Sequence, residues 1–159
     1  MMKTTKDKMY VYISINGFKM DVAEIEKKIG FKHTSVNRKG DPIGSTKLKY
    51  KKSKWEYRVY ANSHFSLDKL ISKIFKKFKN QKALKMLSKI GDPEIVCVFH
   101  SRERLPELSI SNKNIKIMAD SGISFWIDYY FLEKGYISWR NGSGLRSNHK
   151  CCLGQRETK

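Results

Sequence analysis

The segment from Ser66 to Lys89, SLDKLISKIFKKFKNQKALKMLSK, places the strongest constraint on what this chain can fold into. Its apolar residues fall three and four positions apart, which is the spacing of one continuous stripe along a helix: Leu67, Leu70, Ile71, Ile74, Phe75 and Phe78. The segment also holds eight lysines and one acidic residue. A membrane-surface helix or a nucleic-acid-binding arm would carry lysines as well. Because the segment lies between two expected strands, we favour a core helix with a basic outer face, interrupted near Asn80 and continued to Ile90.

Period-two alternation and short apolar runs predict strands around this segment: Met9–Asn16, Lys54–Asn62, Glu94–Ser101, Glu107–Ser111 and Ile123–Phe131. A short helix is expected after the first strand, with Asp21 as its N-terminal cap and Gly30 as its stop. A second one is expected after Ser111, ending at Gly122. The uninterrupted apolar middle of the strand around Cys97 indicates burial on both faces or a central position.

This order of elements predicts an α+β fold with a mainly antiparallel sheet, helices packed on one face and ferredoxin-like character. The polar connection from Lys32 to Ser53 is long for a compact domain, so it is functional or mobile. Residues 1–132 are expected to form a single domain. Residues 133–159 read as a basic C-terminal extension, which we expect to be disordered from about 141 because the NGSG stretch resembles a linker and periodicity ends there.

The net charge of +18, from 33 Lys and Arg against 15 Asp and Glu, favours anionic partners. Abundant Lys, Ile and Asn also fits a lysine-rich bacterial or phage proteome, in which the excess of lysine has no functional meaning. Three cysteines, two of them adjacent, do not make a disulfide framework, so we expect a cytoplasmic protein. No apolar run approaches the length of a membrane span.

Signals for catalysis are weak throughout the chain. The sequence contains neither a Walker-type nor a dinucleotide-binding glycine-rich loop. The four histidines do not pair at metal-ligand spacing. His100 and Ser101 emerge at a strand end but carry no readable nucleophile and base pattern. Asp128 shares a strand face with Trp126 and Tyr130, and we expect it to face water on the open side of the sheet. We therefore expect no enzymatic activity, no cofactor and no bound metal.

The most informative cluster combines cations with aromatic rings around the second expected strand: Arg38, Lys39, Lys47, Lys49, Tyr50, Lys51, Lys52, Lys54 and Trp55. Cations neutralise carboxylates or phosphates, and an exposed ring can fill a protein pocket or stack on a base. In the alternative interpretation Trp55 lies in the core, Tyr50 belongs to a hairpin and the lysines solvate a loop.

Several stretches together resemble the bacterial family described as domain of unknown function 4279: ISINGFKMDVAEIEKKIGF, RKGDP, KW, SLDKLISKIF and IKIMADSGISFWIDYY. The similarity covers roughly residues 10–131. It implies a small intracellular α+β domain of bacteria or their phages and supplies no activity. By analogy with other small families, it suggests an immunity or conflict role beside a toxin.

Two binding functions follow from these observations. The first is a non-catalytic protein of immunity or phage–host conflict type, in which the basic cluster docks on an acidic partner protein. The alternative is a protein that binds nucleic acid or a nucleotide with the same residues.

Overall fold

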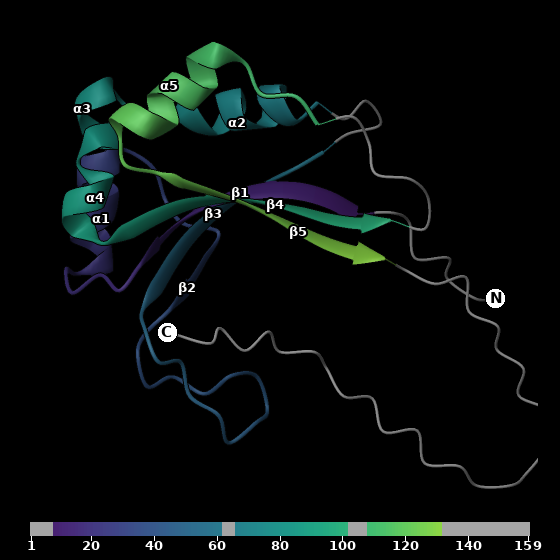
Figure 1. The fold of residues 1–159 in the computed structure, drawn as a ribbon. Coiled ribbons are helices and arrows are strands. Elements are labelled where there is room, and N and C mark those ends of the chain that lie inside the picture. The colour runs from purple at the N-terminus through teal and green to yellow at the C-terminus, as the bar shows by residue number, and fades with distance from the viewer. Residues whose placement is uncertain (1–7, 62–65, 102–107, 132–159) are drawn as a thin grey trace, which may run out of the picture.

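The computed structural model describes residues 8–61, 66–101 and 108–131, and Figure 1 shows their arrangement. The elements, in chain order, are β1 (Lys8–Asn16), α1 (Val22–Ile29), β2 (Ser35–Asn37), β3 (Lys54–Tyr60), α2 (Leu67–Phe75), α3 (Gln81–Lys85), α4 (Leu87–Ile90), β4 (Asp92–Ser101), α5 (Asn112–Asp120) and β5 (Ser124–Phe131). The expectations for residues 133–159, and for the first residue of the strand expected at Glu107–Ser111, fall outside the described residues.

The five strands form one sheet in the order β2-β3-β1-β4-β5. The pairs β2–β3, β3–β1 and β1–β4 are antiparallel, whereas β4 and β5 are parallel. The helices α2 and α5 cover one face of the sheet, and α1, α3 and α4 stack at one end of it (Figure 1). The predicted α+β class, with a mainly antiparallel sheet, is confirmed, and the two layers fit the expected ferredoxin-like character.

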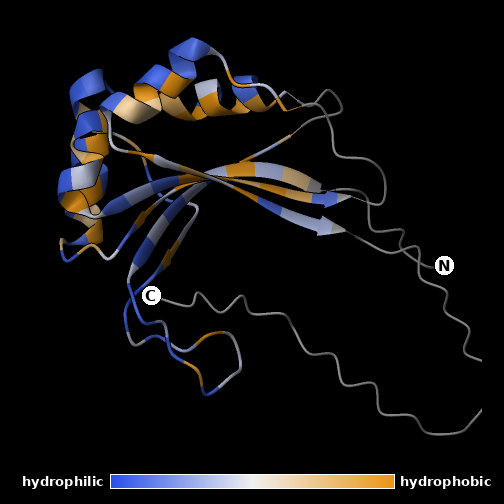
Figure 2. Cartoon of the chain, viewed as in Figure 1, coloured by the Kyte–Doolittle hydropathy of each residue, from blue (hydrophilic) through white to orange (hydrophobic). Residues whose placement is uncertain are grey.

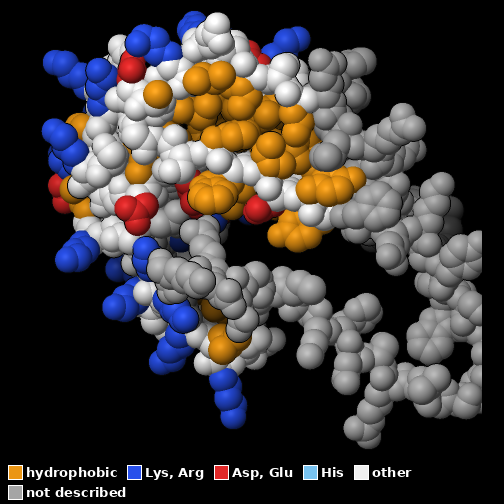
Figure 3. Space-filling view, in the orientation of Figure 1, with side chains coloured by type: hydrophobic (Ala, Val, Ile, Leu, Met, Phe, Trp, Pro, Cys, Tyr) orange, Lys and Arg blue, Asp and Glu red, His pale blue; other side chains and the backbone are white. Residues whose placement is uncertain are grey.

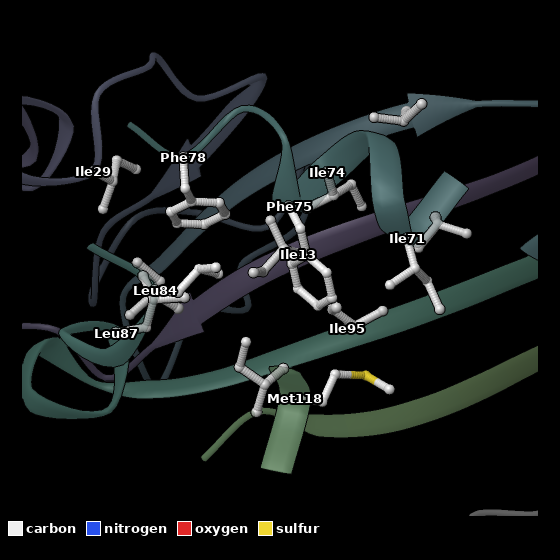
Figure 4. Packing of buried hydrophobic residues seen from close by; sticks show 14 of the residues in the cluster. Ile13, Ile29, Ile71, Ile74, Phe75, Phe78, Leu84, Leu87, Ile95 and Met118 are labelled. Carbon is white, nitrogen blue, oxygen red and sulfur yellow. The ribbon is translucent and has the colours of Figure 1, made fainter. Parts of the chain in front are cut away.

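The segment that begins at Ser66 is a core element, as its apolar stripe predicts. Ile71 and Ile74 are fully buried, and Phe75 packs beside them under α2 (Figure 4). Burial of each such side chain contributes about 1.5–3 kcal/mol. The break expected near Asn80 is real, because the Asn80 side chain accepts a hydrogen bond from the Ala83 N–H and starts α3. In Figure 2 the hydrophobic residues of the helices face the sheet and the hydrophilic ones face outward.

The short helix α1 ends where the sequence predicts. Asp21 Oδ1 accepts the Ala23 N–H at 2.8 Å, and Gly30 takes the left-handed conformation with φ 99°. A Cβ at this φ is strained, so glycine suits the stop. The strand expected around Cys97 is β4, and it is buried on both faces, as its apolar middle predicts. Val96 and Val98 point away from the helices, yet each is only 3% exposed.

Two local expectations differ from the structure. Residues 108–111 form no strand, because Ser111 caps α5 and gives both its N–H and its hydroxyl to Asp68 Oδ1 at 2.8 Å. These bonds fix the start of α5 against α2 and occupy the Ser111 N–H, which a sheet would otherwise need. The long connection after Lys32 contains the three-residue strand β2, which pairs with β3.

Candidate functional site

Six of the seven cations predicted for binding lie in an exposed hairpin between β2 and β3, which we call the basic loop: Arg38, Lys39, Lys47, Lys49, Lys51 and Lys52. The hairpin is held by backbone hydrogen bonds, among them Gly40 N–H to the Tyr50 carbonyl and Tyr50 N–H to the Asp41 carbonyl, both at 2.9 Å. The six cations therefore stand on an ordered scaffold. Tyr50 is half-buried within this hairpin, as the alternative interpretation expected.

The base of the loop and the turn after β1 enclose two adjoining hollows of about 350 and 310 Å³. The charged residues that line them are Lys19, Arg38, Lys39, Lys51, Lys52 and Asp92. Asp92 lies 3.7 Å from Lys52, and Asp21 lies 3.9 Å from Arg38, with all four side chains largely exposed. Exposed pairs of this kind contribute little energy, so the region keeps a positive potential.

Trp55, in contrast, is not available to any partner. It is fully buried and packs edge-on against Phe31 at 5.6 Å between ring centroids. The alternation of β3 explains this position: Trp55, Tyr57 and Val59 face the helices, whereas the even-numbered residues face the other side of the sheet. The prediction that Trp55 anchors a partner is therefore wrong, and Lys54 belongs to a different surface from the basic loop.

That surface is the side of the sheet opposite the helices, which we call the open face. Its aromatic residues come from four strands: Tyr10, Tyr12, Tyr60, His100, Trp126 and Tyr130. The register places Tyr60 beside Tyr10, and His100 beside Tyr130. Ring centroids are 5.5 Å apart for Tyr10 and Tyr60, 6.3 Å for Tyr10 and His100, and 4.7 Å for His100 and Tyr130. A row of rings thus crosses the sheet from β3 to β5.

Two cations lie on these rings and are fixed by one carboxylate. The Arg58 guanidinium lies 4.4 Å from the centre of the Tyr10 ring, and Lys54 Nζ lies 4.3 Å from the centre of the Tyr12 ring. Glu56, only 7% exposed, accepts hydrogen bonds from Arg58 Nε and Nη2, and its other oxygen is 3.2 Å from Lys54 Nζ. Cation–π contacts and charge-assisted hydrogen bonds both strengthen as water is excluded.

These contacts also move the pKa values of the groups involved. Burial raises the pKa of Tyr12, partly offset by the neighbouring Lys54 charge. Burial alone would lower the pKa of Lys54, but the contacts with Tyr12 and Glu56 outweigh it, and the pKa is raised. The pKa of Arg58 is raised in the same way by Tyr60 and Glu56, against the effect of burial. Both cations therefore stay charged over the whole physiological range.

The open face as a whole is not positive. Its charged side chains, among the residues that the structure describes with their side chains, are Lys54, Arg58, Glu56, Asp92, Glu94 and Asp128. Asp128 is exposed on this side, as expected, and Glu94 accepts a hydrogen bond from the Ser14 hydroxyl at 2.9 Å. A phosphate backbone would gain little from such a balance, whereas a mixed protein surface is compatible with it.

Two features that bear on catalysis can be described within residues 8–61, 66–101 and 108–131. No group of three His, Cys, Asp or Glu side chains there could hold a metal ion. Burial raises the pKa of the Cys97 thiol to about 12, so this thiol is not a nucleophile at neutral pH. His149, Cys151 and Cys152 lie outside the described residues.

Comparison with known proteins places the chain in a family. A model of the family described as domain of unknown function (DUF4279) matches residues 7–132. The chain belongs to this family. The DUF4279 match runs from the start of β1 to the residue after β5, so it contains the basic loop and the open face. No curated protein and no solved structure matches the chain. Among the described residues, none of the helices has the length and apolar character to cross a bilayer.

Proposed function

We propose that the protein is a non-catalytic binding module that docks the open face of its sheet on a partner protein, with the basic loop turned toward acidic residues of that partner. The observation that carries this proposal is the row of aromatic rings with Arg58 fixed upon it. Tyr, Trp and Arg are enriched at the energetic centres of protein interfaces. Tyr and Trp bury a large area with few rotatable bonds, and Arg adds hydrogen bonds in a planar group.

The geometry suits such an anchor because the rings at its centre are already held in place. Arg58 is tied to Glu56 and Tyr60 and lies over Tyr10, so little side-chain freedom is lost on binding. The rings toward the sides of the face remain accessible: Tyr60 is 58% exposed, Trp126 50% and Tyr130 51%. These three side chains offer the apolar area that a partner would bury.

The basic loop supplies the second part of the proposal. Lys54, the first residue of β3, follows the loop directly, so the hollows of the loop adjoin the end of the open face. Cations on an exposed scaffold attract an acidic surface over distance and raise the association rate more than the final affinity. The basic loop would thus guide the partner and the aromatic rings would hold it.

An immunity or conflict role is one form of this function, in which the acidic partner is a toxin or a phage protein. Nucleic-acid binding is the second candidate, favoured by the cations and rings that share one surface. We rank it lower because Arg58 and Lys54 already occupy the inner rings and because carboxylates offset their charge.

Photo-crosslinking in cells of the native host tests the proposal. A photoreactive phenylalanine analogue replaces Tyr60 in one strain and Lys76, on the outer face of the helices, in the control strain. We expect one discrete protein adduct at position 60 only, with an identified protein that binds the purified chain. Adducts that disappear on nuclease treatment would favour the nucleic-acid candidate, and equal adducts at both positions would contradict the open face as the docking surface.

A further inference from the structure

The edge strand β5 presents a hydrogen-bonding edge and apolar side chains on both of its faces. It pairs with β4 on one side, and none of the strands in the described part of the chain pairs with its other side. Every second backbone N–H and C=O of β5 points to this other side, where none of the described strands lies. These groups form stronger bonds with another strand than with water once apolar neighbours surround them.

The side chains of β5 do not protect this edge. Trp126 and Ile127 are 50% and 45% exposed, and Tyr129 and Tyr130 are exposed as well. Natural proteins usually guard an edge strand with lysines, a proline or a bulge, and β5 contains no lysine, arginine or proline. Figure 3 shows hydrophobic side chains gathered over α5 and β5, while Lys and Arg lie on the outer helices and the basic loop.

The charge distribution favours a copy of the same chain as the occupant of this edge. A net charge of +18 opposes contact between two copies wherever their lysines meet. Asp128 is the single residue of β5 with a charged side chain. Two copies can therefore pair along β5 with no lysine on either of the paired strands, and each would add a carboxylate to the interface of an otherwise basic partner.

We propose that β5 is the place where a second copy of this chain joins the sheet, by antiparallel pairing of the two β5 strands about a twofold axis at Ile127. In this register Ile127 faces Ile127 of the second copy, and Trp126 faces Asp128 of the second copy. The two carboxylates do not oppose each other, and the indole N–H of Trp126 has an acceptor nearby. The register also keeps both helical layers on one side, so the two open faces become one continuous surface.

Cysteine crosslinking and sedimentation of the full chain test this pairing. In a chain with Cys151→Ser and Cys152→Ser, residue Ile127 is replaced by cysteine, and Leu48→Cys in the basic loop is the control, since Leu48 is also an exposed apolar residue. Directly opposed residues have Cβ atoms about 4.5–5.5 Å apart, which brings a disulfide within reach after small adjustment. We expect rapid covalent dimers under mild oxidation for Ile127→Cys and none for Leu48→Cys.

The sedimentation arm uses single substitutions to lysine. We expect the unmodified chain to sediment as a dimer, and Ile127→Lys to raise its dissociation constant about tenfold or more because two like charges then face each other. Leu48→Lys adds the same charge and should leave the constant unchanged. A monomer at every concentration would overturn the proposal. So would failure of Ile127→Cys to crosslink, which is the result expected if the chain's own residues after Phe131 occupied the edge.

Discussion

The imidazole ring of His100 stacks on the phenol ring of Tyr130, with 4.7 Å between centroids and 8° between planes. The two residues face each other in the parallel pair β4–β5, and Tyr10 continues the stack toward β3. An aromatic pair of this kind contributes about 0.5–1.5 kcal/mol beyond the area it buries. We expect His100→Ala to lower the free energy of unfolding by about 1 kcal/mol in urea denaturation. His100→Phe keeps a ring in place and should recover most of the loss; equal losses for both would contradict a role for stacking.

A second prediction concerns the carboxylate under the cations. Arg58→Met removes both hydrogen bonds to Glu56, a side chain that is nearly buried, and leaves Lys54 as its remaining cation. We expect a loss of about 1–3 kcal/mol in the free energy of unfolding, because one buried oxygen loses its donors. The double variant Arg58→Met with Glu56→Gln removes the charge as well and should be the more stable of the two. Denaturant titration of the three chains measures the difference.

A third prediction follows from the joint between α2 and α5. Asp68 accepts hydrogen bonds from the Ser111 N–H, the Ser111 hydroxyl and Asn114 Nδ2, and these bonds hold its pKa below the usual value. Because the pKa is lower in the folded chain than in the unfolded one, near 3.9, the carboxylate adds stability above about pH 4. This contribution is lost as the pH falls through the folded pKa.

The variant Asp68→Asn should therefore be less stable than the unmodified chain at pH 7, and the gap should narrow as the pH falls from about 4 to 2. Thermal unfolding across that range measures the gap. Glu26, whose pKa is also lowered by a hydrogen bond from the His33 N–H, titrates in the same range and is present in both chains, so it cancels in the comparison. A gap that stays constant with pH would show that the Asp68 charge is not what the joint needs.

Gly91 yields a fourth prediction, based on space alone. A Cβ at Gly91 would lie 2.4 Å from the Asn16 carbonyl oxygen and 3.0 Å from the Ile15 side chain. Backbone atoms cannot move aside cheaply, so we expect Gly91→Ala to cost about 1–3 kcal/mol, as overpacking does. Its effect should appear as a lower denaturation midpoint with the same slope. A midpoint within error of the unmodified chain would show that β1 and β4 separate freely at this end.

A fifth prediction concerns the association rate. Lys39→Glu, Lys51→Glu and Lys52→Glu together reverse the charge around the hollows. Lys76→Glu, Lys77→Glu and Lys85→Glu make the same net change at exposed positions after α2 and in α3. For the protein captured at position 60, we expect the loop variant to associate about tenfold or more slowly at low salt, with a weaker salt dependence. Stopped-flow mixing measures both rates, and an equal effect of the two variants would exclude a specific role for the loop.

Much of the fold could be predicted from local sequence patterns, because these patterns determine the type and the ends of single helices and strands. The spacing of Leu67 to Phe78 predicts a buried helix face, and Asp21 and Gly30 mark the ends of α1. The strand expected at Glu107–Ser111 is absent over residues 108–111, because Asp68, a side chain from another helix, accepts hydrogen bonds from Ser111. The local spacing of apolar residues does not reveal hydrogen-bond partners that lie far apart in the sequence.

The candidate site was predicted only in part, for a related reason. Each strand alternates visibly, so Tyr10, Tyr60, Trp126 and Asp128 could each be assigned to a face of its own strand. Their gathering on one surface depends on the strand order and on the parallel pairing of β4 with β5, which the alternation does not contain. The same alternation places Trp55 on the helix side, opposite to Lys54, and the basic cluster proposed from sequence proximity joined residues that face different ways.

The affinity of the Tyr60→Ala variant for the captured partner, measured by calorimetry at moderate salt, tests the open face most directly. Tyr60 is exposed on β3, away from β5, so its removal leaves the proposed pairing edge intact. Loss of an aromatic anchor that a partner buries costs about 2 kcal/mol or more, and we expect binding at least about tenfold weaker, with Leu48→Ala unchanged. Equal affinities for Tyr60→Ala and the unmodified chain would contradict docking through this face.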